Sequence, residues 1–348
     1  MSAIWTLIDL LAERRDPATL SDSEWESVIS VARAEALAAA LAQRLANAAL
    51  PDEIAALFAD LRAAAKVQQN AALWEAEMAR RALEPAGVRF VLLKGTAYAA
   101  AGLPCAAGRQ IGDLDILVAR EDLDRAEAAL LAAGWEWVKS DPYDDAYYRQ
   151  HMHELPPLIH KDRDRMIDVH HTILPLTHRA RPDAGAMMEN CKPLPFRGGV
   201  GVGTVSPSPE GEGLFVLDPA DMVIHCAAHL IADGDLSGGL RNLWDFRCLI
   251  HQFPGDREEM AERAELHGLG KAFERASRLD QRIFFHWDFR SGGWGDYTDP
   301  LFVRRLTARD DWGRPTRPFT RLLFYLRSHW LRMPPLMLAR HLWVKWRR

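Results

Sequence analysis

The fold of this chain of 348 residues is decided by three short stretches: Lys94-Gly95-Thr96, Gly112-Asp113-Leu114-Asp115-Ile116-Leu117-Val118 and Ile167-Asp168-Val169-His170. An apolar run at 88–93 precedes the first stretch, and the other two are largely apolar apart from their aspartates. Short apolar runs of this kind are typical of buried strands. The glycine after Lys94 indicates a turn from the first strand into a helix. The three stretches therefore predict neighbouring strands that carry acidic side chains.

The aspartates of these strands are spaced for metal binding. Asp113 and Asp115 are two residues apart and point to the same face of a strand, with Cα atoms about 6.8 Å apart at ~3.4 Å per residue. Two bare carboxylates this close repel each other, and a divalent cation removes that cost. Asp168 lies in an apolar strand, where an unpaired charge is expensive. The three aspartates therefore predict a site for two Mg²⁺ ions, with Mn²⁺ as a substitute.

Residues upstream supply what a phosphate site needs. Gly95 lets the backbone approach phosphates closely, Thr96 offers a hydroxyl and an N–H at a helix start, and Lys94 brings a positive charge. Arg109, four residues before Asp113, can steer a triphosphate or neutralise developing charge. We therefore predict that these residues bind a nucleoside triphosphate such as ATP.

In this order, the motifs resemble the nucleotidyltransferase superfamily with the DNA polymerase beta-like fold. They are more similar to the branch described as uncharacterised nucleotidyltransferases, in which a KG turn, an RxxGDxD strand and a later IDxH strand recur. The resemblance implies that Gly95-Thr96 fills the place of the superfamily's Gly-Ser turn, with threonine where serine is usual. It implies that Asp113 and Asp115 are the metal-binding pair and Asp168 the third carboxylate. It also implies a mixed sheet flanked by helices.

The rest of the chain is organised around this core. Ala-rich runs such as Glu35 to Ala42 have helical spacing, and a long helix from Glu53 to Leu83 stops at Pro85-Ala86-Gly87. Alternating strands and helices, then a hairpin at 158–170, predict an α+β fold with one mixed sheet. Helices return after Asp218-Pro219. We expect three regions: an N-terminal helical region (1–84), a nucleotidyltransferase-like core (85–215) and a C-terminal helical region with a basic tail (216–348).

Histidines outside the motifs are further candidates. His225 and His229 have a spacing that can bind zinc, but no glutamate follows the first histidine and no third ligand has a fixed spacing. A structural role, through a hydrogen bond to Asp245 or packing on the core, is preferred. Lining the acceptor pocket and forming a zinc hydrolase site are the alternatives. His170, on the same strand face as Asp168, is the better candidate for orienting a metal ligand.

The segment before the hairpin holds potential proton acceptors. His151, His153 and Glu154 precede a Leu-Pro-Pro-Leu turn. A histidine or glutamate close to the metal site can serve as a general base for an acceptor hydroxyl. Farther on, the glycine-rich run Gly198 to Gly203 lacks the GK[ST] ending of a phosphate loop and is predicted to be a flexible turn region.

Composition limits the class of protein. Hydrophobic residues make up 48% and charged residues 26%, as in ordinary globular proteins. The net charge of −5 does not favour a nucleic-acid partner. No apolar run is long enough for a membrane span. The cysteines lie far apart without a CxxC pair, which predicts free thiols and a cytoplasmic location; they are Cys105, Cys191, Cys226 and Cys248.

The tail is locally very basic. From Gly313 to Arg348 there are nine Lys or Arg residues and no acidic one. Together with Trp330, Trp343 and Trp346, it has the composition of a segment that lies on an anionic membrane. The preferred interpretation is a C-terminal helix that packs its tryptophans onto the body while the arginines stay solvated.

These features predict a Mg²⁺-dependent nucleotidyltransferase that moves a nucleoside monophosphate from an NTP to an acceptor and releases pyrophosphate. The acceptor can be a small molecule, a peptide or a protein, and the sequence does not specify it or the preferred base. Because fold does not secure function, the alternative is a catalytically silent nucleotide-binding or scaffold protein of a biosynthetic pathway.

Overall fold

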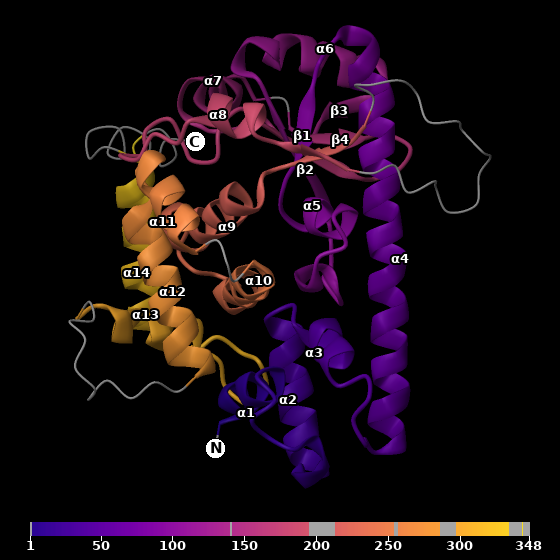
Figure 1. Cartoon of the computed structure of the whole chain (residues 1–348), viewed down its shortest axis with the longest axis vertical. Helices are drawn as coiled ribbons and strands as arrows, with labels where there is room; N and C mark the ends of the chain where they lie inside the picture. The colour runs from indigo at the N-terminus through magenta and orange to yellow at the C-terminus, as the bar shows by residue number, and fades with distance from the viewer. Residues whose placement is uncertain are drawn as a thin grey trace.

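The computed structural model describes residues 2–139, 141–194, 213–253, 257–285, 297–333 and 343. In Figure 1 a β-sheet occupies the upper half of the molecule, and the long helix α4 (Asp52–Leu83) runs beside it along almost the whole length. Helices from both ends of the chain fill the lower and left parts of the view. The fold is α+β with one mixed sheet, as predicted.

The sheet has seven strands in the order β3-β4-β5-β2-β1-β7-β6. β2 runs parallel to β5 and antiparallel to β1, while β4 and β5 form the predicted hairpin. The two short strands β6 and β7 at one edge were not predicted, because two residues give no recognisable alternation. The bounds are β1 Phe90–Leu92, β2 Asp113–Val118, β3 Trp135–Trp137, β4 Leu158–His160, β5 Met166–His170, β6 Lys192–Pro193 and β7 Phe215–Val216.

The N-terminal region is helical, as predicted, but its Ala-rich run is interrupted. Helix α2 (Asp22–Ala34) begins with a capping box in which Ser21 and Glu24 bond each other's backbone N–H. Ala36 adopts a left-handed backbone conformation (φ 54°), so a new helix, α3 (Ala38–Arg44), starts only after it. The predicted helix over 35–42 is therefore wrong for its first residues. Helix α1 spans Ala3–Leu11.

Short helices connect the strands of the core. Helix α5 follows β1, and α6 follows β2. Helix α7 was not predicted, because its sequence between Pro142 and His151 is polar and carries few apolar residues at helical spacing. The bounds are α5 Lys94–Ala100, α6 Leu123–Ala132, α7 Pro142–His151 and α8 Ala184–Glu189.

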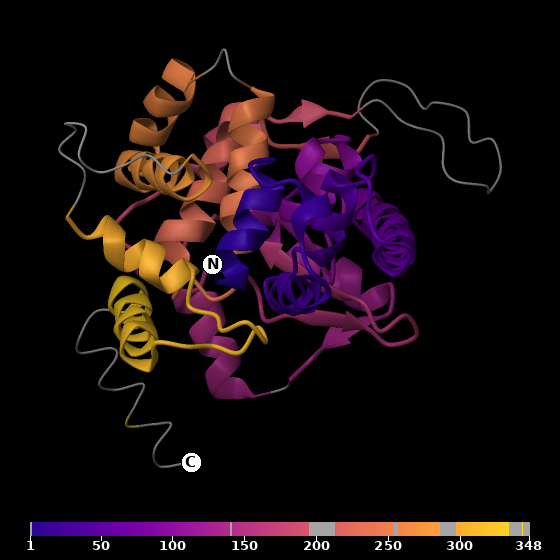
Figure 2. The same ribbon diagram turned by 90° about the horizontal axis from the view of Figure 1, so that it is seen from below.

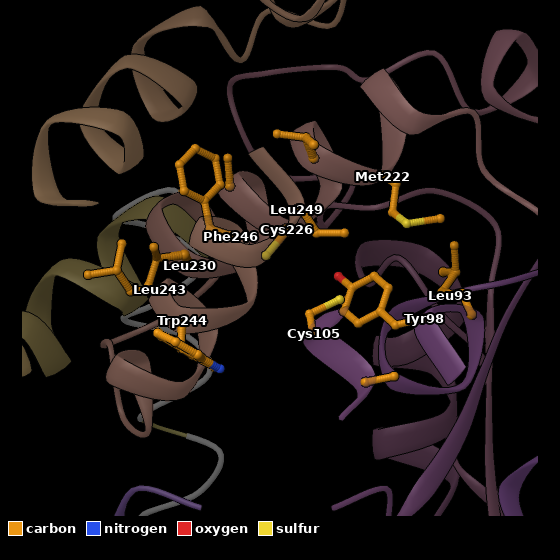
Figure 3. Close-up of a cluster of buried hydrophobic side chains, with 14 of the residues drawn as sticks. Leu93, Tyr98, Cys105, Met222, Cys226, Leu230, Leu243, Trp244, Phe246 and Leu249 are labelled. Carbon is orange, nitrogen blue, oxygen red and sulfur yellow. The ribbon is translucent and has the colours of Figure 1, made fainter. Parts of the chain in front are cut away.

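The C-terminal helices pack on the core, and Figure 2 shows them gathered on one side of the molecule. Helix α9 is extended by a π-helical turn, His229–Asp233. In the cluster drawn in Figure 3, Tyr98 and Cys105 face Met222 and Cys226 of α9, so the sheet region and the C-terminal helices share one buried core. The bounds are α9 Pro219–Ala228, α10 Gly239–Gln252, α11 Arg257–Leu266, α12 Gly270–Phe284, α13 Asp299–Leu306 and α14 Pro318–Arg332.

The tryptophans of the tail do not pack onto the body as expected. Trp330 is 57% exposed and Trp343 is 51% exposed, so that expectation is wrong for both. Trp346 and the glycine-rich run at 198–203 lie outside the described residues. All four cysteines are free thiols, as predicted. Within the described residues, no helix has the length and apolar character needed to cross a membrane.

Candidate active site

The register of the sheet brings the three predicted carboxylates together. β2 and β5 are parallel neighbours, and Asp115 lies directly opposite Asp168 in this pairing. Asp113 is two residues from Asp115 and therefore on the same face of β2. One oxygen from each of the three side chains lies within 4.8 Å of the other two. Asp113 is exposed and Asp115 is buried, so the group reaches from solvent into the protein.

Two hydrogen-bond donors, Lys94 and His170, contact the most buried carboxylate. Lys94 Nζ lies 2.6 Å and His170 Nε2 3.0 Å from Oδ1 of Asp115. Burial alone would raise the pKa of Asp115, but Lys94 and His170 hold it well below its usual range. Asp115 is therefore ionised at neutral pH. Both contacts fall on Oδ1, so in the described part of the chain the other oxygen remains available to a ligand.

Asp168 is in the opposite electrostatic situation. Burial, followed by repulsion from Asp115 and Asp113, raises the pKa of Asp168 from 3.8 to about 7. Lys94 only partly offsets this effect. The cluster thus holds more negative charge than its neighbours neutralise, which is the condition that a bound cation relieves.

The turn between β1 and α5 positions Lys94. The Leu93 N–H donates to the carbonyl of Asp115 (3.0 Å), which fixes the end of β1 beside β2. Lys94 then adopts a left-handed conformation with φ 47°, which is uncommon for a residue with a side chain. Such backbone strain is often found at functional sites. Thr96 is buried, and its Oγ1 has no hydrogen-bond partner among the described residues.

Arg109 lies in a different environment from the one predicted. It forms an ion pair with Asp245 of α10, and its guanidinium is 5.6 Å from the ring centroid of Tyr98. A Cβ added to Gly95 would lie 2.6 Å from Arg109 Nε. The absence of a side chain at Gly95 therefore has a clear packing reason, namely the close approach of Arg109.

Asp245 also forms an ion pair with Arg241, which was not predicted as a site residue. Arg241 Nη2 lies 2.6 Å from Asp245 Oδ1 and donates to the Cys105 carbonyl (2.9 Å). Burial and the nearby Arg109 lower the pKa of Arg241 to about 9. The signal was present in the sequence, because Arg241 and Asp245 have the i, i+4 spacing of a helical ion pair. Asp245 thus accepts from arginines and holds α10 against the segment before β2.

His225 lies in α9, and His229 begins the π-helical turn that follows it. Burial, followed by Lys94 and His229, lowers the pKa of His225 well below its usual range, so its imidazole is neutral. The charges of His170 and Asp115 also act on the pKa of His225. Among the described residues, the groups of three or more possible metal ligands do not include His225 or His229. The described part of the chain therefore offers no third ligand for a zinc hydrolase site at His225 and His229.

The segment before β4 contributes two more polar side chains. His153 and Glu154 lie next to His170, with Glu154 Oε2 3.5 Å from His170 Nδ1. His151 is instead at the end of α7, where its ring lies 5.4 Å from that of Tyr147. Of the three candidates for a general base, His153 and Glu154 therefore lie beside His170, which in turn contacts Asp115.

The geometry defines an α+β protein with an acidic centre on two parallel strands and a lysine beside it. Residues 21–285 match the family model described as uncharacterised nucleotidyltransferase. Because this match covers well over half of the chain, the protein belongs to that family, as the motifs predicted. It therefore contains a nucleotidyltransferase domain, formed by most of its length. No curated protein matches the sequence.

Proposed function

We propose that the chain is a Mg²⁺-dependent nucleotidyltransferase that moves a nucleoside monophosphate from an NTP to an acceptor and releases pyrophosphate. The observation that carries this proposal is the convergence of Asp113, Asp115 and Asp168 within 4.8 Å. The set offers only carboxylate oxygens, which suit Mg²⁺ or Mn²⁺. Their mutual repulsion, expressed in the raised pKa of Asp168, is the cost that a cation removes.

Each side chain of the centre then has a role. Asp113, Asp115 and Asp168 hold the cations. Two divalent cations bound there supply stabilisation of negative charge on the attacking and leaving oxygens. Asp168 completes this set of ligands, and we assign its carboxylate to help activate the acceptor hydroxyl. His170 donates from Nε2 to Asp115 and keeps that carboxylate oriented.

The triphosphate is assigned to the turn before α5. Lys94 carries the positive charge, and Gly95 and Thr96 offer backbone N–H groups at the helix start. The buried Oγ1 of Thr96 gains a partner if a ligand reaches it. Arg109 packs on Gly95 and pairs with Asp245. We therefore assign Arg109 to supporting this turn, in preference to direct contact with the phosphates.

One contact favours the alternative of a catalytically silent nucleotide-binding or scaffold protein. Lys94 Nζ, 2.6 Å from Asp115 Oδ1, supplies positive charge where a metal would otherwise supply it. In the catalytic proposal, Lys94 must share Asp115 with a metal or turn to the phosphates. In the alternative, it stays on Asp115 and no turnover occurs.

The test uses the full chain with each of the four NTPs and Mg²⁺, in the presence of small-molecule and protein fractions as acceptors. Metal-dependent NTP binding and pyrophosphate release are both measured. We expect Asp113→Ala to abolish both, and Asp60→Ala, an equal charge change on the exposed face of α4, to leave both unchanged. Binding without release in the wild type supports the silent alternative, and an unchanged rate in Asp113→Ala refutes the catalytic role.

A further inference from the structure

A second group of possible metal ligands lies beside the carboxylates. Backbone bonds hold the segment before β4 against the end of β5. The His171 N–H donates to the His153 carbonyl (2.9 Å), and the Leu155 N–H donates to the Val169 carbonyl (2.9 Å). Glu154 forms an antiparallel β-bridge with His170 of β5. The backbone thus fixes where its side chains project, before any ligand arrives.

The side-chain geometry of this group matches a small coordination sphere. Glu154 Oε2 lies 3.6 Å from His153 Nε2 and 3.5 Å from His170 Nδ1. The ligand atoms of the three residues all lie within 4.8 Å of one another. In a tetrahedral zinc site with bonds of about 2.0–2.2 Å, ligand atoms are roughly 3.3–3.6 Å apart. The separations on Glu154 therefore need little adjustment.

The second ring nitrogen of His170 also supports a metal site. Its Nε2 donates to Asp115 Oδ1 at 3.0 Å. Metal-binding histidines almost always donate from the second ring nitrogen to a carboxylate or carbonyl, which fixes the tautomer that leaves the first nitrogen ready to bind. His170 is nearly completely buried, so it is held in this orientation.

We propose that His153, Glu154 and His170 form a site for Zn²⁺ or a similar divalent transition metal. Two imidazoles and one carboxylate are the ligand set of zinc centres that keep an open coordination position. The set differs from the all-oxygen cluster of Asp113, Asp115 and Asp168, which suits Mg²⁺. The ion would be linked to that cluster through His170 and Asp115.

The test measures metal binding, so it does not depend on the proposed transferase activity. The chelator-treated full chain is titrated with Zn²⁺ and with Co²⁺, whose visible absorption reports the ligands. We expect one equivalent to bind to this group in the wild type, in addition to any ion that the carboxylate cluster takes up. We expect Glu154→Gln, which preserves shape, and His153→Ala to weaken binding by more than about 100-fold. Asp115→Asn changes the carboxylate behind His170 and also the carboxylate cluster, and is expected to cost about 10–100-fold; the loss due to the cluster alone is given by Asp113→Ala.

Two control variants separate the possible locations of the ion. Asp113→Ala alters the carboxylate cluster without touching this group and is expected to retain Co²⁺ binding. His229→Ala tests the histidine at the start of the π-helical turn after α9 and is expected to retain Co²⁺ binding as well. Binding lost in either control but kept in His153→Ala overturns the proposal. So does a wild type that binds neither metal, because the group is then an ion-pair network alone.

An independent observation concerns helix α14. Its apolar residues Phe319, Leu322, Leu326 and Trp330 recur at helical spacing and are 86%, 53%, 57% and 57% exposed. The opposite face, represented by Phe324, is buried and fixes the helix on the body. Apolar side chains that lie exposed along one face of a helix are a feature of interaction sites.

The charge around the stripe indicates the partner. The segment from Gly313 to Arg348 holds nine basic residues and no acidic one, and Arg321 and Arg332 belong to α14 itself. A helix with an apolar face and basic flanks lies in the interface of an anionic bilayer. We infer that α14 docks the protein on an anionic phospholipid surface.

Vesicles of phosphatidylcholine with and without phosphatidylserine test this inference by cosedimentation of the full chain. We expect binding only with phosphatidylserine, weakened by salt, and at least about tenfold weaker for Leu326→Glu. Leu266→Glu, a matched change at a 66% exposed position on α11, is expected to bind like the wild type. Equal binding of the two variants overturns the inference. So does self-association of the wild type without lipid binding, if Leu326→Glu abolishes that self-association.

Discussion

Replacing Asp168 by asparagine should stabilise the metal-free protein above neutral pH. Burial, followed by repulsion from Asp115 and Asp113, raises the folded-state pKa of Asp168 to about 7, against 3.8 for the free side chain. The folded state therefore holds this proton more tightly than the unfolded state. The stabilising contribution is full below pH 3.8 and is lost as pH rises to about 7. Above about pH 7, the side chain of Asp168 is ionised in the folded state, and its burial and the neighbouring carboxylates lower the free energy of unfolding.

The structure sets the size of the effect. A shift of about three pKa units corresponds to about 4 kcal/mol at 1.36 kcal/mol per unit. This is an upper limit, because Asp168 is partly exposed and its neighbours can relax. We expect about 1–2 kcal/mol. For a chain of this length, that is a rise in Tm of about 2–5 °C for Asp168→Asn at pH 8.

The assay is thermal unfolding at pH 5 and pH 8, in EDTA and in excess Mg²⁺. In EDTA the variant should exceed the wild type at pH 8 and approach it at pH 5, where Asp168 is protonated. Mg²⁺ should raise the Tm of the wild type more at pH 8 than at pH 5, and should do little for Asp168→Asn. Asp60→Asn, on exposed α4, controls for the charge change. A variant that is less stable than the wild type at pH 8 in EDTA refutes the electrostatic reasoning.

Further predictions concern the turn before α5. Lys94→Met removes the cation that neutralises Asp115, so Mn²⁺ should bind roughly tenfold more tightly without nucleotide, a gain of about 1.4 kcal/mol, while NTP binding weakens; calorimetric titration measures both. An unchanged Mn²⁺ affinity would show that Lys94 does not compete with metal. Gly95→Ala brings a Cβ to 2.6 Å from Arg109 Nε and should lower the free energy of unfolding by about 1–3 kcal/mol in urea. Gly112→Ala, with nothing within 4 Å of the new Cβ, is its control and should change stability little. Equal losses in the two variants would contradict the packing argument.

Local patterns were sufficient to predict the strands of the core. The apolar runs and the i, i+2 spacing of Asp113 and Asp115 depend only on neighbouring residues, and the structure confirms the strands that they predicted. The position of Asp168 opposite Asp115 depends on the parallel pairing of β2 with β5. No single stretch encodes that pairing. The convergence of the three aspartates was predicted through the order of the motifs and the family that they resemble, but the parallel pairing itself was not predicted.

Contacts between distant segments were the part that the sequence could not supply. Arg109 was assigned to phosphates because of its distance from Asp113 along the chain. Its ion pair with Asp245 arises only when α10 packs on the core. Exposure of Trp330 is a similar case, because an amphipathic pattern shows that a helix has an apolar face but not whether the body covers it. Sequence patterns thus identified candidate side chains better than their partners.

The charges of the centre also link its two proposed ligands. Without ligands, Lys94 neutralises Asp115 while Asp168 remains poorly compensated. A triphosphate brings negative charge that attracts Lys94, and as Lys94 turns toward it, Asp115 becomes more available to metal. Nucleotide should therefore raise the affinity for Mg²⁺, and by thermodynamic necessity Mg²⁺ should raise the affinity for nucleotide by the same factor. In Lys94→Met this part of the coupling should disappear while the direct attraction between metal and phosphate remains. A coupling of equal size in wild type and variant would mean that Lys94 does not move between the two partners.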